Sequence, residues 1–397
     1  MLGFWLCEEP RVGKHPPTDS SVIIIGSGFS GVSCAYFLQQ AGCDDILLID
    51  DDCYKSASFR NCGHILPGLV ESMFALQKIH PAPKATQIWQ FSLDCCTRIR
   101  QTIAALATDV DYQQNGYLVV AIDTTEEREH LQSVAALRDA GFTNNSYLQA
   151  SSLRKFGIRS EYGARFDADG ASANPLKFRN ALLQFCLTQG LRYSSKQPVQ
   201  SVREQNSRAV IKLQSGKTLH ADIVVLATNA YTSLLSPVFT NLIVPFRGQI
   251  ITSAPLLNTL PPALNMPFSF NHGYEYGLIT ADKRLMFGGW RENTAGEKYT
   301  YDLTPNPQVE SGLKDFAARY LDFAGDIKWE YSHSGIMGSS ASGLPYVSST
   351  PNTSIYVCAG FTGHGFSLAH GCAELLTKII MGESDLPAVS KYLKLSI

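Results

Sequence analysis

The sequence predicts an α/β protein with a doubly wound parallel sheet and a second, α+β domain built on a mixed or antiparallel sheet. Three observations support this fold class. An apolar strand pattern near residue 22 leads into a glycine turn and a helix, residues 354–382 repeat that arrangement, and short strands broken by turns lie between them. The 397 residues are enough for two or three domains.

The first unit is a strand, a helix and a second strand. Residues 22–25 form a continuous apolar run, as expected for a buried parallel strand. The helix predicted over 30–40 ends at Gly42, a typical C-cap residue. The second strand, 46–49, is followed by three aspartates.

The middle of the chain mixes both element types. Residues 125–141 are amphipathic and follow a strand pattern at 116–123, and a helix is expected over 174–190, with Pro175 in its first turn. Residues 196–231 predict three successive strands, and 271–293 predict a hairpin that turns at 281–283.

These elements predict a discontinuous domain arrangement. An N-terminal arm is expected at 1–17. The predicted cofactor-binding domain comprises 18–82, 145–240 and 326–397, and the predicted substrate domain comprises 83–144 and 241–325.

Composition narrows the function classes. A formal net charge of −2 gives no reason to expect nucleic acid or an anionic membrane as partner. The ten cysteines have no paired CxxC spacing, which favours reduced thiols. The chain start lacks a signal-peptide pattern and no segment of about twenty apolar residues occurs, so no membrane span and a cytoplasmic location are expected. No spacing of His, Asp or Glu suggests a metal site.

The strongest chemical signal is Gly26-x-Gly28-x-x-Gly31 between the first strand and helix. Glycines here permit a sharp turn, the approach of a pyrophosphate and close helix packing, as in a Rossmann-like dinucleotide site. Asp50, at the end of the next strand, can accept hydrogen bonds from a ribose diol. The alternative is a chance glycine spacing.

Two later segments have weaker signals. An apolar strand that ends in Ala227 and Thr228 is similar to the second cofactor-contacting strand of two-dinucleotide-domain flavoproteins, which favours FAD over NAD. A glycine turn at 360–365 precedes a helix whose N-terminus could face negative charge on a reduced flavin. Taken alone, these segments are also compatible with a buried strand and an ordinary loop-to-helix joint.

Segments in order along nearly the whole chain resemble the glycine, sarcosine and D-amino-acid oxidase superfamily of FAD enzymes, and most closely its γ-glutamylputrescine-oxidase-like branch. The resemblance rests on "FWL…P" (4–10), "GSGFSG", "SASFRNCGH" and "GIMGSSASGLPYV…AGFTGHGF". It implies a Rossmann-like FAD-binding domain and a mixed-sheet substrate domain.

The resemblance also implies which residues contact FAD. Gly335 and Asn61 stand where some relatives carry a flavin-tethering cysteine or histidine, so non-covalent FAD is expected. The predicted cofactor-binding residues are Gly26, Ser27, Gly28, Phe29, Ser30, Gly31, Asp50, Asp51, Ser58, Arg60, Asn61, Cys62, Gly63, Val199, Ala227, Thr228, Gly335, Gly338, Gly360, Phe361, Thr362, Gly363, His364, Gly365 and Phe366.

Catalytic candidates come from the same comparison. Arg60 falls near the expected flavin N5, and His64 replaces a common glutamine and could point into the substrate cavity. Tyr276 and Trp290, together with Tyr274, are candidates for an aromatic wall, although a packed core or surface role is equally expected for each. Arg291 could pair with a substrate carboxylate or phosphonate, although an exposed surface arginine is the commoner case.

Three further observations leave alternatives open. Ser367 and Met286 stand where sarcosine oxidases carry lysines, which leaves oxidase or dehydrogenase undecided. Cys62 lies two residues from His64, so a thiol nucleophile is a minor alternative. His272 and His333 are interpreted as ordinary polar residues.

The resemblance implies oxidation of a small amine or amino acid by hydride transfer to flavin N5, followed by hydrolysis of the imine. The electrons would pass to O₂, giving H₂O₂. The alternatives are a dehydrogenase of the same fold that reduces a carrier or quinone, a non-catalytic flavin-binding protein and a non-redox NAD-binding module.

Overall fold

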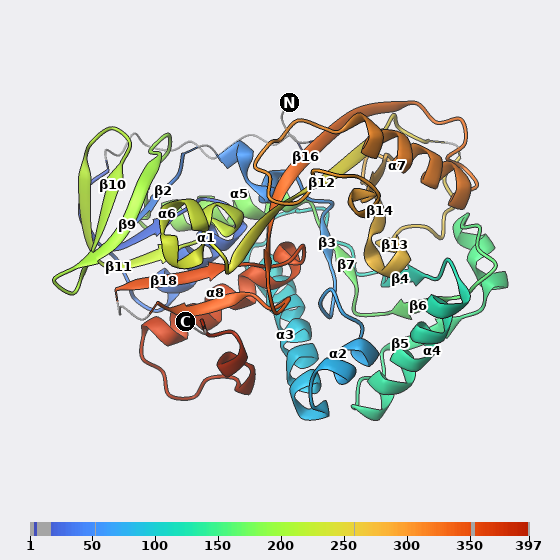
Figure 1. Cartoon of the computed structure of the whole chain (residues 1–397), viewed down its shortest axis with the longest axis horizontal. Coiled ribbons are helices and arrows are strands. Elements are labelled where there is room, and N and C mark those ends of the chain that lie inside the picture. Colours follow the sequence, from blue (N-terminus) through green and yellow to red (C-terminus); the bar gives the residue numbers. More distant parts are fainter. Residues whose placement is uncertain (1–3, 6–16, 52, 258, 351–353, 396–397) are drawn as a thin grey trace.

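The computed structural model describes residues 4–5, 17–51, 53–257, 259–350 and 354–395. Two eight-stranded sheets lie side by side, with the long strands β12 and β16 in the middle of the molecule (Figure 1). Most of the predicted N-terminal arm falls outside the described residues; Phe4 and Trp5 lie within them. No helix in the described part of the chain has the length and apolar character needed to cross a membrane.

The first sheet is mainly parallel. Its strand order is β17-β18-β11-β1-β2-β8, and β9 and β10 extend from β11 as antiparallel strands. The central strands β1 and β2 are apolar and buried, as strands covered on both faces must be. The strands are β1 (Ser20–Ile25), β2 (Ile46–Ile49), β8 (Arg192–Ser194), β9 (Val199–Gln205), β10 (Arg208–Leu213), β11 (Thr218–Leu226), β17 (Tyr346–Ser349) and β18 (Ile355–Ala359).

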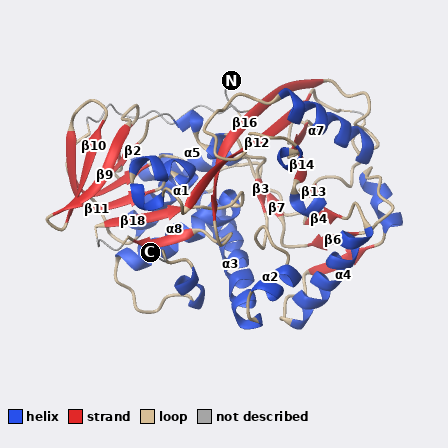
Figure 2. Cartoon of the chain, in the orientation of Figure 1, coloured by secondary structure: helices blue, strands red, loops and turns tan. Residues whose placement is uncertain are grey.

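Helices gather around this sheet (Figure 2), among them α1 (Phe29–Gln40), α3 (Ala82–Leu106), α5 (Pro175–Thr188) and α8 (Gly365–Ile380). Helix α1 contacts α5 and α8, and α3 also contacts α8. His370 links three of the helices, because its ring nitrogens lie 2.9 Å from the hydroxyls of Ser33 and Thr102.

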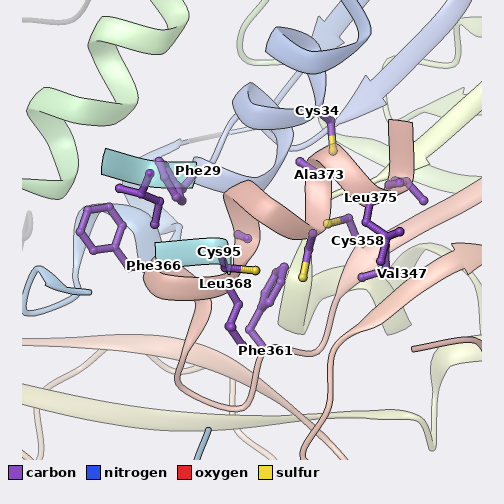
Figure 3. Close-up of a cluster of buried hydrophobic side chains, with 14 of the residues drawn as sticks. Phe29, Cys34, Cys95, Val347, Cys358, Phe361, Phe366, Leu368, Ala373 and Leu375 are labelled. Atoms are coloured by element: carbon purple, nitrogen blue, oxygen red, sulfur yellow. The ribbon is translucent and has the colours of Figure 1, made fainter. Parts of the chain in front are cut away.

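The core beneath α1 and α8 is apolar and rich in sulfur. Figure 3 shows Cys34, Cys95 and Cys358 among aromatic and aliphatic side chains of this cluster, and all three are free thiols. Phe29, the first residue of α1, lies 5.0 Å from Phe366 near the start of α8, ring centroid to ring centroid. This packing fixes the N-termini of α1 and α8 relative to each other.

The second sheet has the order β16-β12-β15-β14-β13-β4-β6-β5. Its strands are β4 (Tyr117–Val120), β5 (Asn145–Leu148), β6 (Ala164–Asp167), β12 (Ile243–Ser253), β13 (Phe268–Phe270), β14 (Glu275–Ile279), β15 (Leu285–Gly288) and β16 (Trp329–Ser340). The remaining elements are α2 (Met73–Ile79), α4 (Thr124–Asp139), α6 (Thr232–Leu235), α7 (Pro307–Tyr320) and a short pair formed by β3 (His64–Ile65) and β7 (Ala171–Ser172).

The two faces of the second sheet differ, because successive strand residues point to opposite sides. Phe268, Phe270 and Phe287 form one face and share a core with α7. Tyr117 and Val119 belong to the other face, where they pack with Leu66, the residue that follows β3. This second face borders the site described below.

The observed sheets differ from the predicted domain division at three places. Strands β5 and β6 pair in the second sheet, although residues 145–240 are predicted for the cofactor domain. Strand β16 pairs with β12 of the second sheet along its length, although residues 326–397 are predicted for the cofactor-binding domain. Helix α3, predicted for the substrate domain, contacts α8. Strand partners are chosen by long-range contacts, which local sequence patterns do not record.

Candidate cofactor and substrate site

A single cavity of about 900 Å³ is lined by residues of both sheets, a volume near the upper end of the range for ligand sites. Its wall runs from the glycine turn after β1, past residues 58–64, to Tyr276 on β14. The segments that sequence analysis singled out separately therefore meet around one space.

The glycine turn is built for close approach. Gly26 has φ +103° and donates its N–H to the Ile49 carbonyl at 2.9 Å. A Cβ on Gly31 would lie 1.8 Å from the Gly26 carbonyl oxygen, so only glycine lets α1 pack against the turn. The N-cap residue of α1, Gly28, has no side chain to cap the helix, and the Phe29 N–H donates to Ser58, so the following first-turn N–H groups are left for an anion such as a pyrophosphate.

Asp50 supports this turn from the end of β2. Its carboxylate accepts the Ser27 backbone N–H at 2.5 Å, and burial raises its pKa. Ser27 is fully buried and accepts hydrogen bonds from Arg179, so it shapes the turn from the side away from the cavity. Asp51 lines the cavity and pairs with Lys55 at 3.1 Å.

The loop 58–64 is held by its own polar side chains. The Ser58 hydroxyl accepts the Phe29 N–H at 2.8 Å, which ties the loop to α1. The Asn61 side chain accepts the Gly63 N–H at 2.8 Å and donates to the Ser58 carbonyl at 3.0 Å. Asn61 thus lines the cavity and also fixes the loop's shape.

Arg60 joins this loop to β16. Its Nε donates to the Tyr54 carbonyl and its Nη1 to the Ser334 carbonyl, each at 2.8 Å. Burial and, after it, the Arg60 charge lower the pKa of His333 to about 4. Arg60 places a permanent positive charge in the cavity wall, while His333 is neutral at neutral pH.

Cys62 and His64 do not form a nucleophile and base pair. Burial raises the pKa of the Cys62 thiol and lowers the pKa of His64 to about 4, so both are neutral at pH 7. The His64 Nε2 lies 3.0 Å from the Gly277 carbonyl, which requires the proton on Nε2 and leaves Nδ1 as an acceptor. The His64 ring also contacts Tyr276 edge-on at 5.8 Å.

The C-terminal turn is fixed by a residue that the sequence analysis missed. The Asn229 side-chain oxygen accepts the Gly360 N–H at 2.9 Å, and the Thr362 N–H donates to the Gly338 carbonyl at 2.9 Å. Helix α8 then begins at Gly365 without a side-chain cap. Asn229 directly follows the predicted Ala227-Thr228 pair. A polar residue at the end of a buried strand is the sequence feature that could have identified it.

Most predicted residues line the cavity. From the cofactor set these are Gly26, Gly28, Phe29, Ser30, Asp50, Asp51, Ser58, Arg60, Asn61, Cys62, Val199, Ala227, Thr228, Gly335, Phe361, Thr362, Gly363, His364, Gly365 and Phe366, and from the catalytic set His64, Tyr276 and Arg291. Ser27, Gly31, Gly63, Gly338 and Gly360 lie behind this wall, where they shape turns.

The structure corrects the assignment of Trp290 to the aromatic wall. Its side chain lies against α7, 6.0 Å from the Phe316 ring, and a Cβ on Gly312 would lie 1.9 Å from its Nε1. Trp290 adopts φ +62°, and the sharp turn there directs the indole into the core of the second sheet. Tyr274 and Tyr276 remain in the cavity wall.

Arg291 is less exposed than a typical surface arginine. Its guanidinium lies 5.0 Å from the Phe246 ring and 5.1 Å from the Tyr274 ring, and its Nε is 3.2 Å from Glu292. Burial raises the pKa of Tyr276, whose hydroxyl is therefore protonated. No group of His, Cys, Asp and Glu in the described part of the chain is arranged to hold a metal ion.

Residues 21–379 match the family described as DAO, FAD dependent oxidoreductase. The chain belongs to this FAD-dependent oxidoreductase family. FAD fits the site, because the α1 N-terminus, the glycine cradle and the buried Asp50 lie together at one part of the cavity, as a dinucleotide requires.

Two bacterial proteins are similar to the chain over most of its length. The chain is 23% identical to the probable oxidoreductase OrdL of Haemophilus influenzae over 94% of this chain and 86% of that protein. It is 24% identical to the γ-glutamylputrescine oxidoreductase of Escherichia coli over 94% and 88% of the two chains.

Solved structures show the same fold. The L-proline dehydrogenase of P. horikoshii aligns with a TM-score of 0.80 at 18% identity, over 96% of this chain and 97% of that one. The glycine oxidase of Geobacillus kaustophilus aligns with a TM-score of 0.80 at 17% identity, over 96% and 99%. These structures confirm the predicted α/β architecture, and the match over residues 21–379 confirms the predicted family.

Proposed function

We propose that this oxidoreductase removes hydride from the carbon of a C–N bond in a small primary or secondary amine or amino acid. The observation that carries the proposal is the continuity of the cavity, which joins the dinucleotide turn to the space beside His64 and Tyr276. The E. coli relative, named for an amine conjugate, supports the substrate class.

The cofactor would be held without a covalent bond. The α1 N-terminus would face the pyrophosphate, Asp50 the ribose and Val199 the adenine, and loop 58–64 would pass the flavin ring. Asn61 and Gly335, at the positions where relatives attach flavin, carry no group able to form that bond. The hydride acceptor is supplied by FAD when it is bound, and the imine product then hydrolyses in water.

The chain's own residues would bind the amine in its reactive, neutral form. Ile250, Tyr276 and Leu66 give the cavity an apolar wall that disfavours the ammonium ion. The neutral His64 offers its Nδ1 as a hydrogen-bond acceptor for an amine N–H. Binding the neutral amine in this way needs no acidic side chain. The positive charge of Arg60 and the α8 N-terminus would stabilise electron density that arrives at the flavin edge.

The direct test is anaerobic flavin bleaching with a panel of polyamine conjugates, N-methyl amino acids, aminophosphonates, taurine and glycine. At least one amine is expected to bleach the yellow holoprotein. If the protein binds FAD but none of these compounds reduces it, the proposal fails for those classes, and a flavin-binding protein without catalysis is the better account.

A dehydrogenase is the second candidate. It is favoured by Met286, fully buried where sarcosine oxidases carry an oxygen-activating lysine. Peroxide is measured under air with an amine that bleaches the flavin, with and without an artificial electron acceptor. Stoichiometric peroxide supports the oxidase, and turnover only with the acceptor supports the dehydrogenase.

A further inference from the structure

Two aromatic residues from the N-terminal arm pack behind the cavity wall. The rings of Phe4 and Trp5 lie 5.3 Å apart, centroid to centroid, and neither residue lines the cavity. Both are partly buried against an apolar cluster whose buried members are Cys62, Ile250, Leu278 and Met286. Cys62 and Ile250 do line the cavity. The cluster therefore has one side in the cavity and another side under these two rings.

Trp5 also holds the backbone of loop 58–64. Its indole Nε1 donates a hydrogen bond to the Asn61 carbonyl at 2.7 Å, across 56 residues of sequence. A Cβ on Gly63 would lie 3.5 Å from the indole ring, which is ordinary van der Waals contact, so the ring lies directly against the loop. The same ring packs on Phe59, near the start of the loop.

The hydrogen bond from Trp5 falls at the part of the loop that faces the cavity. Other long-range hydrogen bonds join Ser58 to α1, Arg60 to β16 and Gly63 to the residue after β7. Between Arg60 and Gly63 the long-range bond comes from Trp5, to Asn61. Both residues between Arg60 and Gly63 line the cavity. Their position therefore depends on an indole that lies outside it.

Phe4 anchors this pair on the second sheet. Its ring lies 5.6 Å from the ring of Tyr331 on β16, edge to face. Tyr331 in turn lies 5.6 Å from the guanidinium of Arg284, which bonds Glu330 at 2.6 Å. Phe4 and Trp5 thus connect the strand at the edge of the second sheet with the loop that follows the first βαβ unit.

We infer that Trp5 is a positioning residue of the cofactor site, which holds loop 58–64 in the place where it meets the flavin. Trp5 acts through Asn61 and Cys62, because it does not reach the cavity itself. The indole orders the loop before FAD arrives, and a loop ordered in advance costs the ligand less binding energy. This inference rests on the proposed course of FAD past the loop, and not on the proposed oxidation of an amine.

The first test uses the apoprotein, in which no cofactor orders the loop. Hydrogen–deuterium exchange of peptides that cover residues 58–64 is compared between wild type, Trp5→Phe and Trp5→Ala. Trp5→Phe keeps an aromatic ring but removes the donor, and is expected to speed exchange there about 3- to 10-fold, as the loss of one hydrogen bond implies. Trp5→Ala also removes the packing and should speed exchange further.

The second test measures the cofactor. Titration of each apoprotein with FAD should give a Kd raised about 3- to 10-fold by Trp5→Phe and at least about 10-fold by Trp5→Ala. At saturating FAD, the visible circular dichroism and the midpoint potential of the bound flavin should also shift, which a purely structural role of Trp5 would not cause.

Trp329→Phe is the matched control. Trp329 is a partly buried tryptophan at the start of β16 that packs on the other core of the second sheet. Its replacement should leave loop exchange, FAD affinity and the flavin spectrum unchanged. The melting temperature of each apoprotein shows whether the variant is folded, and Trp5→Phe carries both tests if Trp5→Ala does not fold.

Two results would overturn the role of Trp5. One is a folded variant with wild-type loop exchange; the other is a folded variant with wild-type FAD affinity and flavin spectrum. Asn61→Ala, which alters the loop directly, shows what else has failed in the second case. If it weakens FAD binding, the loop still borders the flavin and only the role of Trp5 is lost. If it changes nothing, the proposed course of FAD past the loop is lost as well.

Discussion

His64 shows how burial decides what a side chain can do. With its pKa lowered to about 4 and its Nε2 donating to the Gly277 carbonyl, the ring is a neutral acceptor in the cavity wall. The same burial keeps Cys62 a thiol. Acid–base and nucleophilic roles for the pair are therefore unfavourable at neutral pH.

His64→Gln is expected to change which amine is preferred, by about 10-fold in the ratio of kcat/KM between two amines, and to leave FAD content unchanged. Glutamine keeps a donor for Gly277 but presents a different polar group to the cavity. The measurement is flavin reduction with paired amines, together with the absorbance ratio of flavin to protein. Loss of FAD with unchanged preference would contradict a substrate-facing role.

Single residues also mark what sequence can reveal. Gly26, Gly28 and Gly31 are predictable, because a strand, a glycine spacing and a helix occur together in one short segment. Asn229 is not, because the Gly360 N–H that it accepts lies far away in sequence. The prediction that Trp290 belongs to the aromatic wall is wrong, because a left-handed backbone conformation at this residue directs its ring into the core. No local sequence pattern indicates that conformation.

At the scale of elements, the βαβ unit depends on the contact between α1 and the turn that precedes it. Residues 20–49 were predictable in order and in type, since helix and strand periodicity are local properties. The sheet membership of β5, β6 and β16 was not, since their hydrogen-bond partners are chosen in three dimensions.

Gly31→Ala is expected to destabilise the protein by about 1–3 kcal/mol and to reduce FAD retention. The added Cβ would lie 1.8 Å from the Gly26 carbonyl oxygen and push α1 away from the turn. Gly325→Ala is the control, because a Cβ there meets no atom within 4 Å, and a change within about 0.5 kcal/mol is expected. Urea unfolding and flavin content provide the measurements, and equal effects of both substitutions would exclude the packing argument.

For the whole molecule, burial of neutral histidines makes stability depend on pH. His64 and His333 have pKa values lowered to about 4, and His130 and His370 to about 3, all mainly by burial. The unfolded chain binds these protons near pH 6.5 and the folded protein does not. Their contribution is complete above about pH 6.5 and is lost progressively toward pH 4 and below.

His370→Gln is expected to flatten this dependence by up to about 1.4 kcal/mol per pH unit between pH 6.5 and 4.5. His220→Gln, which removes an exposed histidine paired with Asp19, is the control and should keep the wild-type slope. Buried carboxyls such as Asp167, with a raised pKa of about 6, act in the opposite sense. The difference between variant and wild-type slopes in urea unfolding isolates the histidine, and identical slopes would refute its neutral burial.

The strand order of the first sheet has a consequence for biosynthesis. β1 pairs with β11, some two hundred residues later, and β11 pairs in turn with β18. Residues 355–380, which lead through the turn into α8 and contribute to the cavity wall, leave the ribosome after all the other strands of both sheets. Until these residues have emerged, the nascent chain has no complete site for FAD. A cell short of FAD would then accumulate finished but unliganded protein, which lacks the stabilisation that binding provides by mass action.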